Sequence, residues 1–146
     1  MDVLFLEIDS DRNWALASIG PAFIGAYIRQ RGHEVSLLRV PLDETSIGLL
    51  EKINKKKPDI LALSLTSRQW IRAREVVRDL RKSLDIPVIV GGLQATYDPE
   101  TVLASAGFDY LCLGEGEEAM VEFLDYLERE EPILQSSIQN IWVRDG

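Results

Sequence analysis

The chain has 146 residues, a formal net charge of −8, 46% hydrophobic residues and 27% charged residues. This length is typical of one domain with its own core, and the negative charge argues against a protein that binds nucleic acid or an anionic membrane. No apolar run approaches the ~20 residues of a membrane-spanning helix, and acids appear too early in MDVLFLEIDSD for a signal peptide. The single cysteine, Cys112, excludes an internal disulfide and any metal site made of cysteines alone. We therefore expect one soluble domain over residues 1–146, in a reducing cytoplasm.

Short apolar runs alternate with helical patterns along the whole chain, which is typical of βαβ units around a parallel sheet. The apolar runs are nearly continuous, as expected for strands that helices cover on both faces. We predict strands at 3–8, 33–40, 59–65, 86–91 and 109–113, and a sixth edge strand within the final segment SIQNIWVRDG.

The segments between these strands have the start and stop signals of helices. Pro21 suits a first turn and Gly32 a helix end, and Ser67 is expected to cap the helix after the third strand. The predicted helices cover about 20–32, 43–56, 67–84, 98–107 and 117–130.

Right-handed crossovers between these elements give an α/β fold, a three-layer αβα sandwich around a parallel sheet. The expected strand order is 2-1-3-4-5, which is flavodoxin-like. In such sheets ligands bind outside the carboxyl ends of the strands, near the switch point between the first and third strands. The loops that follow the strands are therefore the candidate sites.

The loops after the first and third strands contain small and hydroxyl-bearing residues. DSDRNWALASIG is long for such a loop, and its small residues, Ala17 and Ser18 among them, leave room for a bulky ligand. The alternative is an ordinary surface loop. Ser64 and Thr66 place hydroxyls at the end of the central strand, which suits a neutral or phosphodiester ligand. The alternative there is helix capping, which we assign to Ser67.

The loops after the fourth and fifth strands are rich in glycine. Gly91 and Gly92 allow the backbone to lie against a flat ligand, although a turn that needs positive φ explains them equally well. In GEGEE, the glutamates from Glu115 onward begin a helix, where carboxylates bind the free amides and exclude a phosphate. Simple helix stabilisation is the alternative. No G-x-G-x-x-G follows the first strand and no G-K-[ST] occurs, so the sequence predicts neither a dinucleotide site nor a P-loop.

Four segments resemble the cobalamin-binding domain that precedes the radical SAM core in cobalamin-dependent methylases and cyclases: GPAFIGAYIRQRGHEV, KPDILALSLTS, IPVIVGGLQATYDPE and FDYLCLGEGEEAM. The resemblance covers nearly the whole chain in order and spacing. It implies that cobalamin lies across the strand ends with its nucleotide tail in the switch-point crevice. The implied contacts are Ala17 and Ser18 on the tail channel, Ser64, Leu65 and Thr66 on the tail, Gly91, Gly92 and Gln94 under the corrin, and Gly114, Glu115 and Gly116 beside it.

The sequence departs from the family pattern at two points. Many cobalamin folds have Asp-x-His-x-x-Gly after the first strand, with the histidine on cobalt, whereas this chain has Asp11-Arg12-Asn13. The only histidine, His33, opens the second strand at the opposite end of the sheet. The implied cobalamin is therefore base-off and without a histidine ligand. No cysteine triad for a 4Fe-4S cluster is present, so the chain alone is not expected to be catalytic. S-adenosylmethionine and the cluster would belong to a radical SAM domain, in cis or in trans.

Two other functions remain open from the sequence. The domain can be a recognition or scaffold module that has kept the fold and lost the cofactor. A phosphoacceptor receiver domain has the same topology, but it needs an aspartate after the third strand and a lysine after the fifth, where this chain has Ser64 and Glu115. The basic residues of the third helix, between Arg68 and Lys82, are interpreted mainly as a solvated face, with docking to an acidic partner as the alternative.

Overall fold

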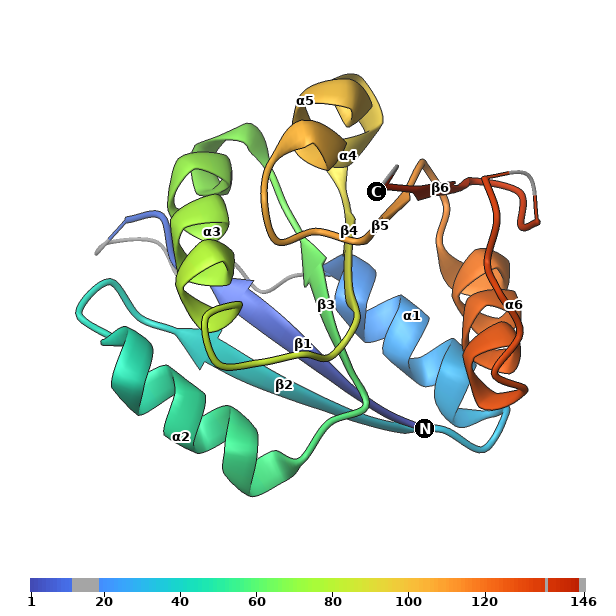
Figure 1. Ribbon diagram of the computed structural model, residues 1–146, viewed down its shortest axis with the longest axis horizontal. Helices are drawn as coiled ribbons and strands as arrows, with labels where there is room; N and C mark the ends of the chain where they lie inside the picture. The colour runs from blue at the N-terminus through green and yellow to red at the C-terminus, as the bar shows by residue number, and fades with distance from the viewer. Residues whose placement is uncertain (12–18, 136, 145–146) are drawn as a thin grey trace.

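The computed structural model describes residues 1–11, 19–135 and 137–144, which form one six-stranded sheet with helices on both faces (Figure 1). The strand order is β2-β1-β3-β4-β5-β6. The first five strands pair in parallel, and β6 pairs antiparallel with β5. The flavodoxin-like order and the sixth edge strand are thus confirmed. The strands are β1 (Asp2–Ile8), β2 (Glu34–Val40), β3 (Ile60–Ser64), β4 (Val88–Gly91), β5 (Tyr110–Cys112) and β6 (Ile141–Val143).

The helices form the two outer layers of the predicted sandwich, with α1 and α6 on one face of the sheet and the other four on the opposite face (Figure 1). Strand β1 shows how the sequence builds both cores, because successive side chains of a strand point to opposite faces. Leu4, Leu6 and Ile8 enter the core under α2 and α3, whereas Val3 and Phe5 enter the core under α1 and α6. The helices are α1 (Ile19–Arg29), α2 (Ser46–Lys56), α3 (Ser67–Leu80), α4 (Leu93–Tyr97), α5 (Pro99–Ala104) and α6 (Glu117–Glu128).

The predicted cap of α3 is wrong, because Thr66 and not Ser67 is the N-cap residue. The side chain of Gln69 reaches back over the first turn, where its Oε1 accepts hydrogen bonds from the Thr66 backbone nitrogen at 2.9 Å and from Thr66 Oγ1 at 3.0 Å. Helix α3 also ends at Leu80, earlier than the predicted Leu84, because a turn follows in which Ser83 N donates to the Leu80 carbonyl.

Most other boundaries also differ from the prediction by one to three residues, as at the ends of α1 (Arg29 instead of Gly32) and α5 (Ala104 instead of Gly107). Helix α2 begins at Ser46 instead of residue 43, because Thr45 caps it by accepting a hydrogen bond from Gly48 N at 3.0 Å. The short helix α4 follows the glycine pair where we predicted only a loop. Within the described residues, no helix combines the length and the apolar character needed to cross a membrane.

Candidate functional site

A narrow slot opens at the carboxyl ends of β3, β4 and β5, between the sheet and the helices α1 and α6. Its volume is about 40 Å³. Several residues predicted for the site come together around this slot, namely Ser64, Gly91, Gly92, Gly114 and Gly116. A larger hollow of about 570 Å³ lies elsewhere, beside Asp85, Asp109 and Arg144. We favour the slot as the ligand site, because ligands of such sheets bind at the carboxyl ends of the strands.

Gly92 packs directly onto the turn between β3 and α3. Its φ of 88° is favourable only for glycine, and a Cβ built on it would lie 2.7 Å from Leu65 N and 2.9 Å from Ser64 Oγ. Around it, Leu65 N donates to the Gly91 carbonyl and Gln94 N donates to the Leu65 carbonyl, each at 2.9 Å. The fold itself therefore requires glycine at position 92, which agrees with the alternative that a turn with positive φ explains this residue.

Gly91 differs from Gly92 in having space beside it. A Cβ on Gly91 would make ordinary contacts, the nearest at 3.5 Å from the Cys112 carbonyl oxygen. Gly114 is more open still, because a Cβ there would have no atom within 4 Å, although its φ of 63° favours glycine. Packing within the protein therefore does not explain why residue 91 is a glycine. The close approach of a ligand to the backbone would explain it.

The two hydroxyls at the end of β3 differ in their availability. Ser64 Oγ lines the slot and makes no hydrogen bond to any described residue, and α1 begins beside it, where a Cβ on Gly20 would lie 3.7 Å away. Thr66 Oγ1 donates to Gln69, and Gln69 Nε2 donates in turn to the Ile8 carbonyl at 2.8 Å. The Ser64 hydroxyl is therefore available to a ligand, whereas Thr66, which the resemblance places on the nucleotide tail, caps α3.

Three other predicted residues, Leu65, Gln94 and Glu115, lie outside the slot lining. Leu65 and Gln94 are buried beneath the rim, and Glu115 is exposed in a separate acidic hollow with Glu117, Glu118 and Glu122. Ala17 and Ser18 lie outside the described residues.

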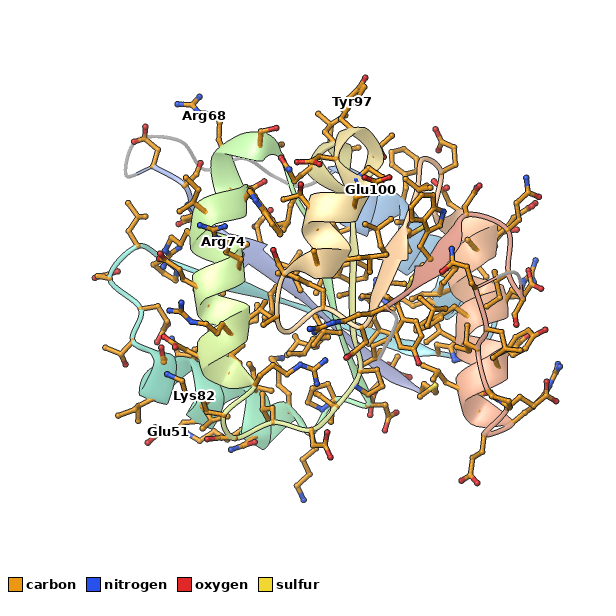
Figure 2. All side chains as sticks on the ribbon, turned by 45° about the horizontal axis from the view of Figure 1, so that its top comes forward. Glu51, Arg68, Arg74, Lys82, Tyr97 and Glu100 are labelled. Atoms are coloured by element: carbon orange, nitrogen blue, oxygen red, sulfur yellow. The ribbon has the colours of Figure 1, made fainter. Side chains whose placement is uncertain are left out.

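Two exposed side chains on α4 were missed by the sequence analysis. Leu93 is 57% exposed and Tyr97 82% exposed, and Figure 2 shows Tyr97 projecting outward above the sheet. Their spacing of four residues could have indicated a common helical face, but the segment is too short for a periodic signal.

The deep part of the slot is apolar. Phe5, Ala62 and Ile89 form its floor; they are register partners across β1, β3 and β4, so their side chains point to the same face. Ile24 of α1 and Met120 of α6 line the slot from the helical side. The slot is nearly filled by the protein's own side chains, since 40 Å³ accommodates about one water molecule.

The ionisable groups near the slot carry little charge into it. Burial raises the pKa of the Cys112 thiol to about 11, and the Glu117 carboxylate adds to this shift, so the thiol that lines the slot is neutral at physiological pH.

His33 is buried at the amino end of β2, where its Nδ1 lies 3.3 Å from Glu128 Oε1. Together with Asp125 these two residues form a cluster of metal-type ligand atoms within 4.8 Å, at the end of the sheet that is far from the slot. No imidazole reaches the slot.

Fewer basic side chains of this segment are exposed than the sequence suggested, because Arg72 of α3 and Arg81, which directly follows the helix, point inward. Arg72 Nη1 donates to the carbonyls of Asp9 and Val40 at 2.7 and 2.9 Å. Arg81 donates to the carbonyls of Gly107 and Ile86 and pairs with Asp109. Arg68 and Arg74 remain on the exposed face (Figure 2). This arrangement agrees with an ordinary solvated face.

Comparison with known proteins identifies the class of domain. A family model described as B12 binding domain matches residues 15–124. The structure is similar to the radical S-adenosylmethionine methyltransferase TsrM from Kitasatospora setae, solved with cobalamin and a 4Fe-4S cluster bound, with a TM-score of 0.84 and 18% identity over 96% of this chain and 26% of that chain. No curated protein matches the sequence.

Two other solved structures share the fold. The cobalamin-dependent S-adenosylmethionine radical enzyme OxsB, with aqua-cobalamin and S-adenosylmethionine bound, has a TM-score of 0.79 and 21% identity over 96% of this chain and 20% of that chain. A cobalamin-binding protein from Desulfitobacterium hafniense DCB-2 has a TM-score of 0.55 and 22% identity over 73% of this chain and 51% of that chain. The chain thus spans about a quarter of the TsrM chain and a fifth of the OxsB chain.

Proposed function

The chain belongs to the B12 binding domain family, and on this premise we propose that it binds cobalamin with the nucleotide tail in the slot and presents the corrin to a radical SAM catalytic domain. The observation that carries the proposal is the slot itself, which opens at the strand ends next to the Ser64 hydroxyl and to Gly114, where a Cβ would meet no atom within 4 Å.

The residues at the mouth of the slot fit such a ligand. Ser64 Oγ can donate to or accept from the phosphodiester and ribose of the tail. Gly91 and Gly114 allow a broad ring to lie close to the backbone. Leu93 and Tyr97 of α4, the helix that follows Gly92, add exposed apolar surface, which suits the apolar face of a macrocycle.

Entry of the tail requires the slot to open. The side chains of Ile24 and Met120 close it from the helical side, so we propose that they move away from the floor when the tail binds. A closed slot lowers the apparent affinity by the fraction of molecules that are open. The residues of the floor, Phe5, Ala62 and Ile89, are fixed in the sheet and form the rigid wall of the site.

We further propose that the bound cobalamin is base-off and has no histidine ligand. His33 is the only histidine of the chain, and it lies at the amino end of the sheet, bonded to the Met1 amino group and near Glu128. Bound cobalamin would supply the methyl-transfer or electron-transfer chemistry, while the role of this chain's residues is to hold the tail and to orient the corrin. S-adenosylmethionine and a 4Fe-4S cluster would be bound by the catalytic domain, in cis or in trans.

The second candidate function is a recognition or scaffold module that has lost the cofactor. The small volume of the slot and the absence of a histidine near it favour this alternative. The two functions differ in one property, namely saturable binding of a cobamide.

Titration of the chain with hydroxocobalamin, followed by the visible spectrum, tests the proposal. We expect saturation with a base-off spectrum, and a large loss of binding in Ser64→Tyr, whose side chain would block the mouth. Ser64→Ala is the matched control, because it keeps the mouth open and removes only the hydroxyl. Circular dichroism checks that both variants fold. No binding at about 100 μM, a concentration that detects moderate affinity, would favour the scaffold module.

A further inference from the structure

The inner lining of the slot contains almost no groups that can form hydrogen bonds. The floor residues Phe5, Ala62 and Ile89 are hydrocarbon, and so is Ile24 on the helical side, while Met120 contributes only a thioether. Among the described residues no amide, imidazole, carboxyl or cationic side chain lines the slot.

The backbone N–H and C=O groups of the floor residues are also not available to hydrogen-bond a ligand. Residues 61–64 of β3 are register partners of 88–91 in β4, and residues 3–5 of β1 are register partners of 60–62 in β3. The backbone groups of these central strands are therefore committed to the sheet ladder on both sides. Of the described residues that line the slot, Cys112 and Ser64 alone have a side chain that can donate a hydrogen bond, and the Cys112 thiol is a weak donor.

We propose that this slot selects among cobamides by their lower base, accepting benzimidazole or phenolic bases and rejecting purines. The inference rests on the proposed function, because it concerns the base at the end of the nucleotide tail. A purine carries an exocyclic amine and ring nitrogens that bind water in solution. Buried against Phe5, Ala62 and Ile89, these groups would lose that water without gaining a partner, which is costly.

The apolar residues deep in the slot discriminate between lower bases, whereas Ser64 at the mouth does not. Ser64 would contact the phosphodiester and ribose, which cobalamin shares with purinyl cobamides, so it adds affinity without discrimination. The apolar floor contacts only the base. An apolar pocket rejects an isostere that adds a polar group by a factor on the order of 10² at most. We therefore expect a measurable but moderate discrimination, and the lower base is the part of the ligand on which it acts.

The test is a parallel titration of the chain with four cobamides: cobalamin, an adeninyl cobamide, a phenolic cobamide and cobinamide, which lacks the nucleotide. We expect cobalamin and the phenolic cobamide to bind within a few-fold of each other. The adeninyl cobamide is expected to bind at least about tenfold more weakly, as one or more unpaired buried polar groups imply. Cobinamide is also expected to bind more weakly, because nothing fills the slot.

The outcomes separate the inference from the function on which it rests. Equal affinity for cobalamin and the adeninyl cobamide would overturn the base selection and leave cobalamin binding intact. Cobinamide binding as tightly as cobalamin would show that the slot does not hold the base, and would also overturn it. Failure of all four ligands would instead contradict the proposed function.

A substitution in the slot gives a second, independent readout. Met120→Gln places an amide in the lining at nearly unchanged volume, and Met120→Leu is its apolar control. We expect Met120→Gln to raise the affinity for the adeninyl cobamide relative to cobalamin by several-fold, and Met120→Leu to leave this ratio unchanged. If Met120→Gln does not fold, Cys112→Ser with Cys112→Ala as control gives the same comparison. An unchanged ratio in the polar variant would contradict the mechanism.

Discussion

Gly92 lies so close to the start of the β3–α3 turn that a Cβ on it would come within 2.7 Å of the backbone nitrogen of Leu65. The same nitrogen donates to the Gly91 carbonyl, so the ends of β3 and β4 are held together at the mouth of the slot. The contact fixes Ser64, the last residue of β3, in its position at the mouth of the slot.

We predict that Gly92→Ala destabilises the fold more than Gly114→Ala does. At Gly92 the backbone conformation alone costs an alanine about 1–3 kcal/mol, and the clash with Leu65 adds to it. Gly114 also has positive φ, but a Cβ there meets no atom within 4 Å, so this variant isolates the cost of the backbone. Urea unfolding of both variants measures the difference. Equal free energies of unfolding would show that the Leu65 contact relaxes without cost.

The order of the strands could be predicted from the sequence because it depends on alternation and connection length, which are local signals. The cap of α3 could not, because Thr66 and Ser67 are both good caps and the choice depends on Gln69, whose amide also donates to Ile8 in β1. A contact between residues that are 61 positions apart leaves no local trace in the sequence.

The candidate site was predicted in outline but not in its details. The rule that ligands bind at the carboxyl ends of the strands selected Ser64, Gly91 and Gly114, and these residues line one slot in the structure. It could not separate Ser64, whose hydroxyl makes no hydrogen bond to a described residue, from Thr66, whose hydroxyl is engaged. It also could not reveal that the slot is closed, because closure depends on side chains of α1 and α6 that are remote in sequence.

Gln69 is predicted to be a structural link of the site and not a ligand-binding residue. Gln69→Leu removes the acceptor for Thr66 and the donor to Ile8, and we expect it to lower the free energy of unfolding by about 1–3 kcal/mol. Gln69→Glu keeps the acceptor for Thr66, but it replaces the donor by a carboxylate oxygen that faces the Ile8 carbonyl at a buried position, so it should also destabilise the fold at neutral pH. Urea unfolding measures both variants. An unchanged free energy of unfolding in Gln69→Leu would show that the hydrogen bonds of Gln69 do not support the fold.

An arginine exposed on α3 and the arginine that directly follows this helix are predicted to differ in their effect on stability. Arg81 donates to two backbone carbonyls and pairs with Asp109, so Arg81→Ala leaves partly buried acceptors unpaired and should cost about 1–3 kcal/mol. Arg74 is exposed, and Arg74→Ala should change the free energy of unfolding by no more than about 0.5 kcal/mol. Urea unfolding compares the two variants. A large decrease in the free energy of unfolding of Arg74→Ala would contradict this prediction and would mean that the exposed arginines of α3 stabilise the fold.

Cys112 makes the stability of the chain depend on pH above 9. Burial raises the pKa of its thiol from 9.0 to about 11, so the folded protein keeps this proton at pH values where the unfolded chain has lost it. The free energy of unfolding should therefore fall as pH rises from about 9 to about 11. Cys112→Ala should not show this part of the decrease. The same burial predicts slow reaction with thiol reagents at pH 8 in the folded state, since the thiolate is the reactive form, and fast reaction in denaturant.

Ile24 is predicted to control access to the slot. A Cβ on Gly116 would lie 2.9 Å from Ile24 Cδ1, so the side chain is held between α6 and the sheet and must move before a ligand enters. Ile24→Ala removes this obstacle; we expect faster association of cobalamin and tighter binding, together with a lower free energy of unfolding, because apolar contacts are lost. Phe23→Ala is the control on the same helix, since Phe23 is exposed and lies outside the slot lining. Stopped-flow absorbance measures the association rates. An unchanged rate in Ile24→Ala would mean that opening of the slot does not limit binding, and the closed conformation would then carry no cost for the ligand.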